Sequence, residues 1–429
     1  MSPRGTLAEA VAAAQERRAA LLPLLAAHRT ELPLRFWRQA AHYTTPASDG
    51  VMARKAVEGG TAPMGRLLER FGVTPVDLAE RLGAPLASVE ALLARPERAP
   101  LVMLDAEDAL ALRDDVTAAG QREAVAALAE ADWAGDGPSA LRFYRPPGIA
   151  LGGTAESLAA VLEGLAERGA TDRLDGIVYP KVEQPEEIEA LYAFLDAAEA
   201  AVGIAPGSIR VAVLVESGWA AARLPDIALA AAPRLAAIVY GLADHAADIG
   251  LPAIAGEHDL ATWVRCQIVN VAGALGVPAI DGMTLAYPVS DSRLDAAADR
   301  ERFLSRVVLC HSEALRARDL GMLGKWVGHP AQLFACLLAF AAAWEPEALE
   351  AEAGKLEAYR WSVEHEGRGA TIIGGVMSDR ATDRHARTLL RRAVAQGRFE
   401  PARAAALGVI SDAERREAEP IWLATEGRT

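Results

Sequence analysis

The sequence has few cysteines and no long apolar run. Its three cysteines, Cys266, Cys310 and Cys336, lie far apart and lack the spacing of a paired or metal-binding motif. Such sparse use of cysteine is typical of a reducing compartment, and we expect a cytoplasmic protein. No apolar stretch reaches the roughly 18 residues that a membrane helix needs, and the N-terminus has no secretory signal core. The sequence therefore predicts no contact with a membrane.

Positive charge is also scarce. The chain has 44 lysines and arginines against 58 aspartates and glutamates, which gives a formal net charge of −14. This balance argues against general nucleic-acid binding, which requires an excess of positive charge. Small anionic substrates stay compatible with it, because they need only local positive charge.

Short apolar runs alternate with longer stretches of helical pattern along most of the chain. Most of these runs are rich in Val, Ile or Leu, and each precedes a helical pattern, so the repeating unit is a strand followed by a helix. Eight such runs favour an α/β fold, the (β/α)8 TIM barrel. A doubly wound sheet is the alternative, but its Gly-rich phosphate fingerprint is missing. The runs are AHYTTPA, PLVMLDAED, SALRFYRP, LDGIVYPKV, IRVAVLVES, LAAIVYGLAD, PAIDGMTL and GKWVGHP.

The patterns divide the chain into three parts. We predict an N-terminal helical segment over 1–33, a barrel over 34–345 and a C-terminal helical lid segment over 346–429. Residues 64–100 form a helical insertion whose apolar spacing around Gly83 resembles a helix-turn-helix unit. Because this insertion is not basic, we expect it to pack on the barrel.

Polar residues gather where the predicted strands end. In a barrel these ends open on one face, which is where the chemistry of such folds takes place. Complementary charges at those positions are hard to explain by core packing alone. The residues are Asp105, Glu107, Asp108, Arg142, Lys181, Glu216, Asp244 and His329.

Glu216 and Asp244 follow neighbouring strands, so a barrel places them side by side. Two such carboxylates repel one another unless a cation lies between them. Mg²⁺ suits this position, with Mn²⁺ as an alternative, because it takes one or two carboxylates and leaves other positions for substrate oxygens. The open positions could chelate a 2-oxo acid. The alternative interpretation is a salt bridge from Glu216 to Arg142 or Lys181.

A strand-end arginine could supply positive charge where an enolate oxygen develops. We predict Arg142 for this role, although Arg145 is close by and faces the other side of the strand. Glu107 and Asp108 would hold the arginine in place, or else form an acidic helix N-terminus. Lys181 could form a Schiff base, but beside a metal pair this is the weaker interpretation.

The order of these motifs resembles the citrate lyase beta-subunit and malyl-CoA lyase group of the HpcH/HpaI aldolase superfamily. Any one motif is weakly specific, whereas seven in the same order are highly specific. They are MLDAEDAL, LRFY, VYPKVE, LVESGWAAARLPDIA, YGLADHAADIG, WVRCQIVNVAGALGVPAID and LGKWVGHPAQL.

The resemblance implies a Mg²⁺-dependent carbon–carbon lyase or synthase. Such an enzyme joins or cleaves an acyl-CoA and a 2-oxo acid of the glyoxylate, pyruvate or oxaloacetate type. It implies that Glu216 and Asp244 bind the metal and that Arg142, Lys181, Gly241 and Ala243 contact substrate. Two other functions stay open, namely a CoA-independent metal-dependent 2-oxo acid aldolase and a regulatory binding protein with an inert barrel.

Asp379 lies in the glycine-rich tail stretch GRGATIIGGVMSD. This stretch resembles a segment of malyl-CoA lyases, and MSDRAT resembles the malate synthase stretch with the catalytic aspartate. The resemblance implies that Asp379 is the base that takes a proton from the acyl-CoA, in the site of a neighbouring subunit. We therefore expect a homo-oligomer, a trimer or a hexamer. The alternative is that Asp379 caps the helix that begins near Ala381.

Overall fold

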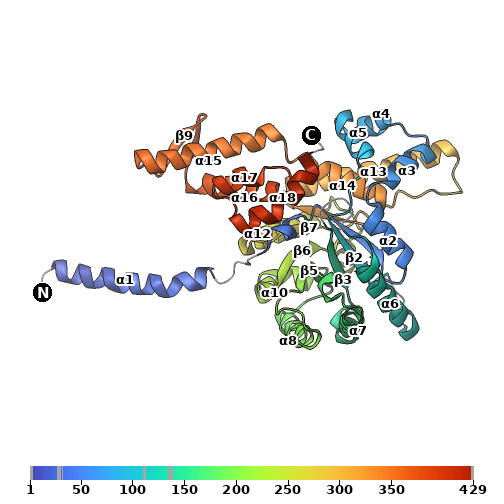
Figure 1. The fold of residues 1–429 in the computed structure, drawn as a ribbon, viewed down its shortest axis with the longest axis horizontal. Coiled ribbons are helices and arrows are strands. Elements are labelled where there is room, and N and C mark those ends of the chain that lie inside the picture. The colour runs from blue at the N-terminus through green and yellow to red at the C-terminus, as the bar shows by residue number, and fades with distance from the viewer. Residues whose placement is uncertain (1–2, 27–29, 31, 110–112, 134–138, 427–429) are drawn as a thin grey trace.

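The structure is a computed structural model that describes residues 3–26, 30, 32–109, 113–133 and 139–426. Eight parallel strands form a closed barrel in which each strand pairs with the next and β8 pairs with β1 (Figure 1). The (β/α)8 barrel expected from the sequence is thereby confirmed. The strands are β1 (Ala41–Pro46), β2 (Leu101–Asp105), β3 (Leu141–Arg145), β4 (Gly176–Tyr179), β5 (Arg210–Val215), β6 (Leu235–Tyr240), β7 (Ala279–Asp281) and β8 (Gly324–Val327).

Helices surround the barrel and bury the outer faces of its strands. Because the strands are covered on both faces, nearly all of their residues are buried, which explains why β2, β5 and β6 are largely apolar in the sequence. The helices around the barrel are α2 (Gly50–Gly59), α6 (Asp114–Glu130), α7 (Thr154–Glu167), α8 (Pro185–Val202), α9 (Gly218–Ala222), α10 (Leu224–Ala231), α11 (Leu242–Asp248), α12 (Asp259–Leu275), α13 (Ala296–Asp319) and α14 (Pro330–Ala341).

The insertion after β1 consists of α3 (Pro63–Phe71), α4 (Pro75–Leu82) and α5 (Leu86–Ala94). It packs on the outer side of α13, where the Phe71 and Phe303 rings stack with their centroids 4.2 Å apart. The turn between α4 and α5 needs a left-handed residue, and Gly83 supplies it with φ 62°. The insertion is therefore part of the outer helical layer.

The chain after α14 forms α15 (Pro346–Glu366), a hairpin of β9 (Thr371–Ile373) and β10 (Val376–Ser378), then α16 (Arg380–Ala395), α17 (Pro401–Ala406) and α18 (Asp412–Glu426). The Arg392 guanidinium of α16 lies over the Trp37 ring, 5.1 Å from its centroid, and the Gln396 side chain donates to the Trp37 carbonyl. Because Trp37 precedes β1, these helices pack at the amino-terminal end of the barrel. This extension therefore does not cover the opposite end of its own barrel.

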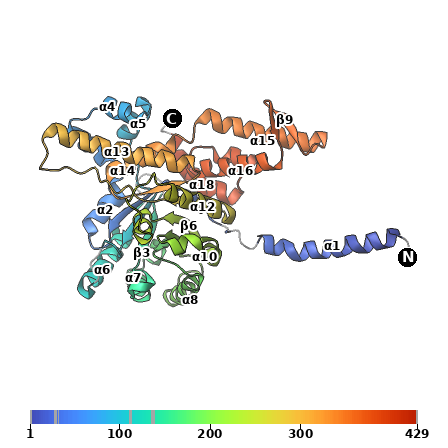
Figure 2. The ribbon, with the colours of Figure 1, turned by 180° about the vertical axis from the view of Figure 1, so that it is seen from behind.

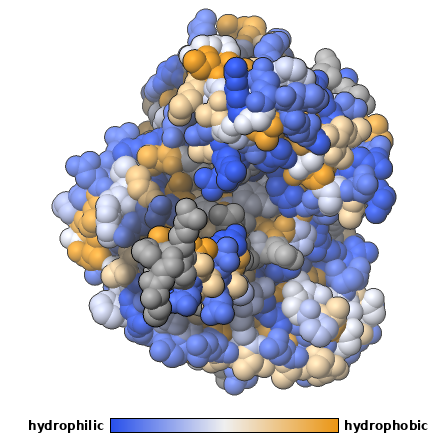
Figure 3. All heavy atoms as spheres, turned by 90° about the vertical axis from the view of Figure 1, so that its left-hand side faces the viewer, coloured by the Kyte–Doolittle hydropathy of each residue, from blue (hydrophilic) through white to orange (hydrophobic). Residues whose placement is uncertain are grey.

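The N-terminal helix α1 (Pro3–Ala26) lies apart from the barrel in both ribbon views (Figures 1 and 2). Figure 3 shows the face of the molecule that lies on the left in Figure 1. This face is mostly hydrophilic, with hydrophobic side chains in small groups. Within the described residues, no helix combines the length and apolar character that crossing a bilayer would require.

Candidate active site

A cavity of about 800 Å³ opens where the strands of the barrel end. We name it the mouth cavity. Its lining includes the last residues of four strands, Pro46, Asp105, Arg145 and Tyr240, while α2 and α3 form part of its wall. Barrel enzymes carry their catalytic groups at this end, because every strand delivers a residue to it.

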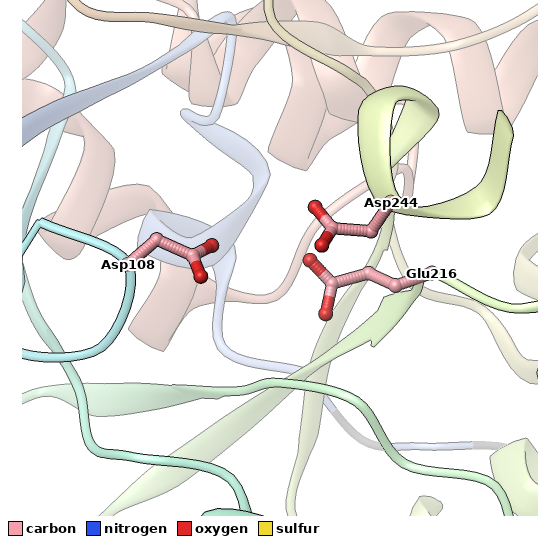
Figure 4. Close-up of side chains that lie close together, drawn as sticks. All are labelled: Asp108, Glu216 and Asp244. Carbon is pink, nitrogen blue, oxygen red and sulfur yellow. The ribbon is translucent and has the colours of Figure 1, made fainter. Parts of the chain in front are cut away.

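Three carboxylates meet at this mouth. One oxygen from each of Asp108, Glu216 and Asp244 lies within 4.8 Å of the others. Asp108 lies in the loop after β2, Glu216 directly follows β5, and Asp244 lies in the first turn of α11. Figure 4 shows the Glu216 and Asp244 carboxylates side by side and Asp108 facing them. The structure thus brings the predicted pair together and adds Asp108, for which the sequence suggested another role.

Backbone geometry makes room for Glu216. A Cβ atom at Gly241 would lie 2.3 Å from the Glu216 Cγ, so only glycine lets the two strand ends approach this closely. The backbone N–H of Lys181 donates to Glu216 Oε2 at 2.9 Å. Lys181 has φ 50°, a left-handed conformation that a lysine rarely adopts. These two constraints fix the direction of the Glu216 carboxylate.

The Glu216 carboxyl group is almost fully buried, and this burial raises its pKa from 4.5 to about 8. Arg145 and Lys181 oppose the shift, whereas Asp244 adds to it. A divalent cation would favour the ionised form that burial disfavours. The donor set contains only carboxylate oxygens, the ligands that hard cations such as Mg²⁺ prefer. The residues present therefore fit a magnesium ion.

Lys181 links the carboxylates through its side chain. Its Nζ lies 2.8 Å from Glu107 Oε1, 3.2 Å from Asp108 Oδ1 and 3.7 Å from Asp244 Oδ1. Burial would lower the pKa of this ammonium group, but the Glu107 hydrogen bond and the nearby carboxylates raise it above its ordinary value. A lysine held in its charged form is a poor Schiff-base nucleophile. This environment therefore favours binding over covalent chemistry for Lys181.

The strand-end arginine at the mouth is Arg145, and the prediction of Arg142 is wrong on this point. The Arg142 guanidinium lies on the other side of β3, where its Nε donates to Asp175 Oδ2 at 2.8 Å. Arg142 is the second residue of β3, whereas Arg145 is the last and lines the mouth cavity. Three positions separate them, so they differ in height by roughly 10 Å and face opposite ways.

Acidic side chains hold the Arg145 guanidinium in a fixed orientation. Asp105 accepts from its Nε at 2.7 Å and from its Nη2 at 2.6 Å. Glu107 lies 3.2 Å from its Nη1 and Asp108 lies 3.1 Å from its Nη2. Glu107 and Asp108 were expected to hold the arginine at position 142, and they contact Arg145 instead. The sequence did not indicate Asp105 as the main partner of Arg145. Asp105 is the last residue of β2, the strand that pairs with β3.

The remaining predicted residues fall in two places. Gly241 and Ala243 line the mouth cavity. Asp379 lies outside it and caps α16, where its side chain accepts from the backbone N–H groups of Ala381 and Thr382. Among the described residues, none beyond Pro330 lines this cavity. Asp379 therefore does not contribute to the mouth cavity of its own chain in this structure.

Two cations line the mouth cavity on the side of the insertion. Lys55 belongs to α2 and Arg66 to α3, and both side chains are exposed. No ion pair within the described part of the chain involves either of them. The chain as a whole is acidic, so binding of an anion requires local positive charge, which Lys55 and Arg66 supply at this cavity.

Fold and site together define a (β/α)8 barrel with a candidate metal centre at the carboxyl ends of its strands. The HpcH/HpaI aldolase/citrate lyase family matches residues 97–299. The L-malyl-CoA/beta-methylmalyl-CoA lyase of Rhodobacter capsulatus is 33% identical over 245 residues, which cover 53% of this chain and 70% of that protein. The protein of the same name from Haloarcula marismortui is 26% identical over 216 residues, with coverages of 49% and 58%.

The chain belongs to the HpcH/HpaI aldolase/citrate lyase family, as its motif order indicated. Enzymes with the names of these relatives are carbon–carbon lyases. A solved structure of a citrate lyase from Burkholderia xenovorans LB400 shares the fold, with a TM-score of 0.55 and 21% identity over 86% of this chain and 95% of that one.

Proposed function

We propose that this chain is a Mg²⁺-dependent lyase or synthase that cleaves or forms the carbon–carbon bond between a 2-oxo acid and an acyl-CoA. The observation that carries the proposal is the meeting of three carboxylates beside a fixed arginine in one cavity. The relatives named L-malyl-CoA/beta-methylmalyl-CoA lyase support the substrate classes.

Glu216 and Asp244 would hold the Mg²⁺ ion, with Asp108 as a third ligand or as the acceptor for a metal-bound water. When bound, the ion supplies positive charge for the oxygens of the 2-oxo acid. Arg145 would contact the oxo acid and stabilise negative charge on its oxygen, because its guanidinium is already oriented by Asp105. Lys181, Gly241 and Ala243 would contribute to binding of the substrate.

The mouth cavity favours a CoA thioester over a small aldehyde as the second substrate. A volume of about 800 Å³ exceeds what an oxo acid alone requires. Lys55 and Arg66 offer positive charge to the phosphates of a CoA group. The CoA-independent aldolase is the second candidate, and it would leave these two cations without a role.

We also propose an assembly with shared sites. Asp379 would act as the base in the mouth of a neighbouring subunit of a trimer or hexamer, so the segment 346–429 would serve as a lid for its neighbour. A cytoplasmic location belongs to the same proposal and is supported by the three free cysteines.

The experiment is a turnover and thermal-shift matrix of Mg²⁺, one oxo acid and acetyl-CoA, with glyoxylate, pyruvate and oxaloacetate tested in turn. Product formation that requires Mg²⁺ and the thioester supports the proposal, whereas turnover without the thioester supports the aldolase. Glu216→Gln and Asp244→Asn should each abolish turnover, because both keep the shape and remove the charge. Asp226→Asn is the matched control, since Asp226 is exposed on α10. Near wild-type turnover in either site variant would contradict the metal assignment.

A further inference from the structure

A second cavity, of about 600 Å³, lies between the insertion and the outer helices of the barrel. We name it the insertion cavity. It shares no lining residue with the mouth cavity. Its volume is in the range of cavities that bind small organic molecules. The insertion contributes to both cavities, because α3 lines the first and α5 lines the second.

Regular helical spacing builds the walls of the insertion cavity. Ser88, Ala91 and Leu92 come from one face of α5, and Arg95 directly follows this helix as its C-cap residue. From α13 come His311, Leu315 and Arg318, again at spacings of three and four residues. Leu337 and Leu338 of α14 complete an apolar base. The cavity therefore combines an apolar interior with polar groups at defined positions.

His311 is the buried polar group in this cavity. The residue is 5% exposed and lines the cavity, yet within the described residues its ring has no hydrogen-bond partner. Burial, together with the nearby Arg318, lowers its pKa to about 4, so the ring is neutral near pH 7. A neutral imidazole carries one donor and one acceptor nitrogen. The ring nitrogens are not among the fully buried polar atoms, so they remain accessible from the cavity and an occupant can hydrogen-bond to them.

The charges around the insertion cavity favour an anion. Arg95, Arg318 and Arg398 line it, against Glu97 and Glu345, which leaves an excess of one positive charge in a chain of net charge −14. Arg398 lies 3.8 Å from Glu97, and Arg318 bonds to Asp319, a residue that does not line the cavity. No ion pair in the described part of the chain involves Arg95, which leaves its guanidinium available.

We propose that the insertion cavity is a second ligand site that binds a small carboxylate with a short apolar chain. The carboxylate contacts the Arg95 guanidinium and the neutral His311 ring, and the chain lies against Leu92, Leu315 and Leu337. A charged head and an apolar body match the two parts of the lining. The proposal does not depend on the reaction at the mouth, because the two cavities share no lining residue.

The test uses the full chain and hexanoate as the probe, with affinity measured by ligand-observed NMR. Ala91→Trp fills the insertion cavity, and Ala87→Trp is its matched control, because Ala87 is exposed on the same helix and does not line the cavity. We expect wild type and Ala87→Trp to bind hexanoate equally and Ala91→Trp to bind at least tenfold more weakly. Equal affinity in Ala91→Trp would show that hexanoate binds outside the insertion cavity and overturn the proposal, as would the absence of binding to wild type.

A second variant separates loss of binding from loss of folding. Arg95 is exposed, so Arg95→Gln should fold normally and weaken hexanoate binding about fivefold or more. Hexan-1-ol serves as the uncharged probe, and its affinity should change little in Arg95→Gln. If hexanoate binding were unchanged in this variant, the carboxylate assignment would be wrong.

Discussion

Arg145 and Asp105 form a two-point ion pair at the ends of neighbouring strands, with N–O distances of 2.7 and 2.6 Å. The two residues are register partners in the pairing of β2 with β3, and both side chains are 4% exposed. A planar guanidinium bound at two points keeps one orientation, which a lysine could not reproduce. The pairing therefore presents a fixed positive charge to the mouth of the barrel.

Arg145→Lys should lower kcat by roughly 10² to 10³, the usual loss when an oriented donor to a developing oxyanion is removed. Mg²⁺ affinity should fall much less, because Arg145 is not a ligand in the proposed site. Arg142→Lys is the matched control from the same strand, and its turnover per folded molecule should stay near wild type. Steady-state kinetics and Mg²⁺ titration check both. A collapse of turnover in Arg142→Lys with an active Arg145→Lys would return the role to Arg142.

The raised pKa of Glu216 predicts how the stability of the metal-free protein depends on pH. Burial raises this pKa from 4.5 to about 8, so between these values the folded chain retains a proton that the unfolded chain has released. The free energy of unfolding of the metal-free protein should therefore contain a part that decreases as pH rises through this window. Mg²⁺ should stabilise the protein more at pH 8.5 than at pH 6, because the proton must leave before the ion binds.

Thermal unfolding in EDTA and in Mg²⁺, from pH 5 to pH 9, measures both effects. Glu216→Gln cannot ionise, so the metal-free variant should lack this part of the pH dependence. Its Mg²⁺ stabilisation should also be lost at every pH. Identical pH slopes for the metal-free wild type and Glu216→Gln would show that another group causes the dependence.

Arg66 is the residue through which we expect the insertion to take part in substrate binding. It lines the mouth cavity from α3, on the same side as Lys55. Arg66→Ala should raise KM for the acyl-CoA about threefold to tenfold and leave kcat nearly unchanged, because the contact is far from the reacting carbon and equally strong before and during the reaction. The effect should shrink with added salt. Arg70→Ala is the control, since Arg70 lies one turn further along α3 and does not line the cavity. Equal KM values for the two variants would remove Arg66 from the binding site.

The barrel could be predicted because most strands contain a short apolar run followed by a helical pattern, and burial on both faces favours such runs. Glu216 and Asp244 could be predicted as neighbours because their strands are adjacent in a barrel. The sequence did not show whether Arg142 or Arg145 lies at the mouth. That depends on the residue at which β3 ends, and two-residue periodicity does not determine where a strand ends. Asp108 lies in a loop, whose course the sequence pattern does not determine. The insertion cavity depends on how α5 packs against α13, which no local pattern encodes.

Asp379 is the residue whose predicted role depends on a second subunit. In one chain its carboxylate caps α16, with hydrogen bonds of 2.8 Å from Ala381 and 3.2 Å from Thr382, and it lies in the extension that packs at the amino-terminal end of the barrel. Asp379 is half-buried beside a glycine-rich hairpin, and in the proposed oligomer this hairpin would bring its carboxylate to a neighbouring mouth. Asp379→Asn keeps the shape of the cap, so the fold should survive, while loss of a general base should lower the rate by roughly 10² to 10⁴. Mg²⁺ binding should not change.

Mixing Asp379→Asn with Glu216→Gln tests whether the sites are shared. Each variant alone lacks one group in every site, so both should be nearly inactive. In mixed oligomers, a mouth with an intact Glu216 can receive an intact Asp379 from its neighbour, so part of the activity should return after subunit exchange. Asp383→Asn is the control, because Asp383 is also in the first turn of α16 but pairs with Arg387. The recovered activity is compared with the extent of subunit exchange, which is monitored by mass spectrometry. Complete exchange without recovered activity would refute the shared site, and a fully active Asp379→Asn enzyme would refute the base, leaving Asp379 as a helix cap alone.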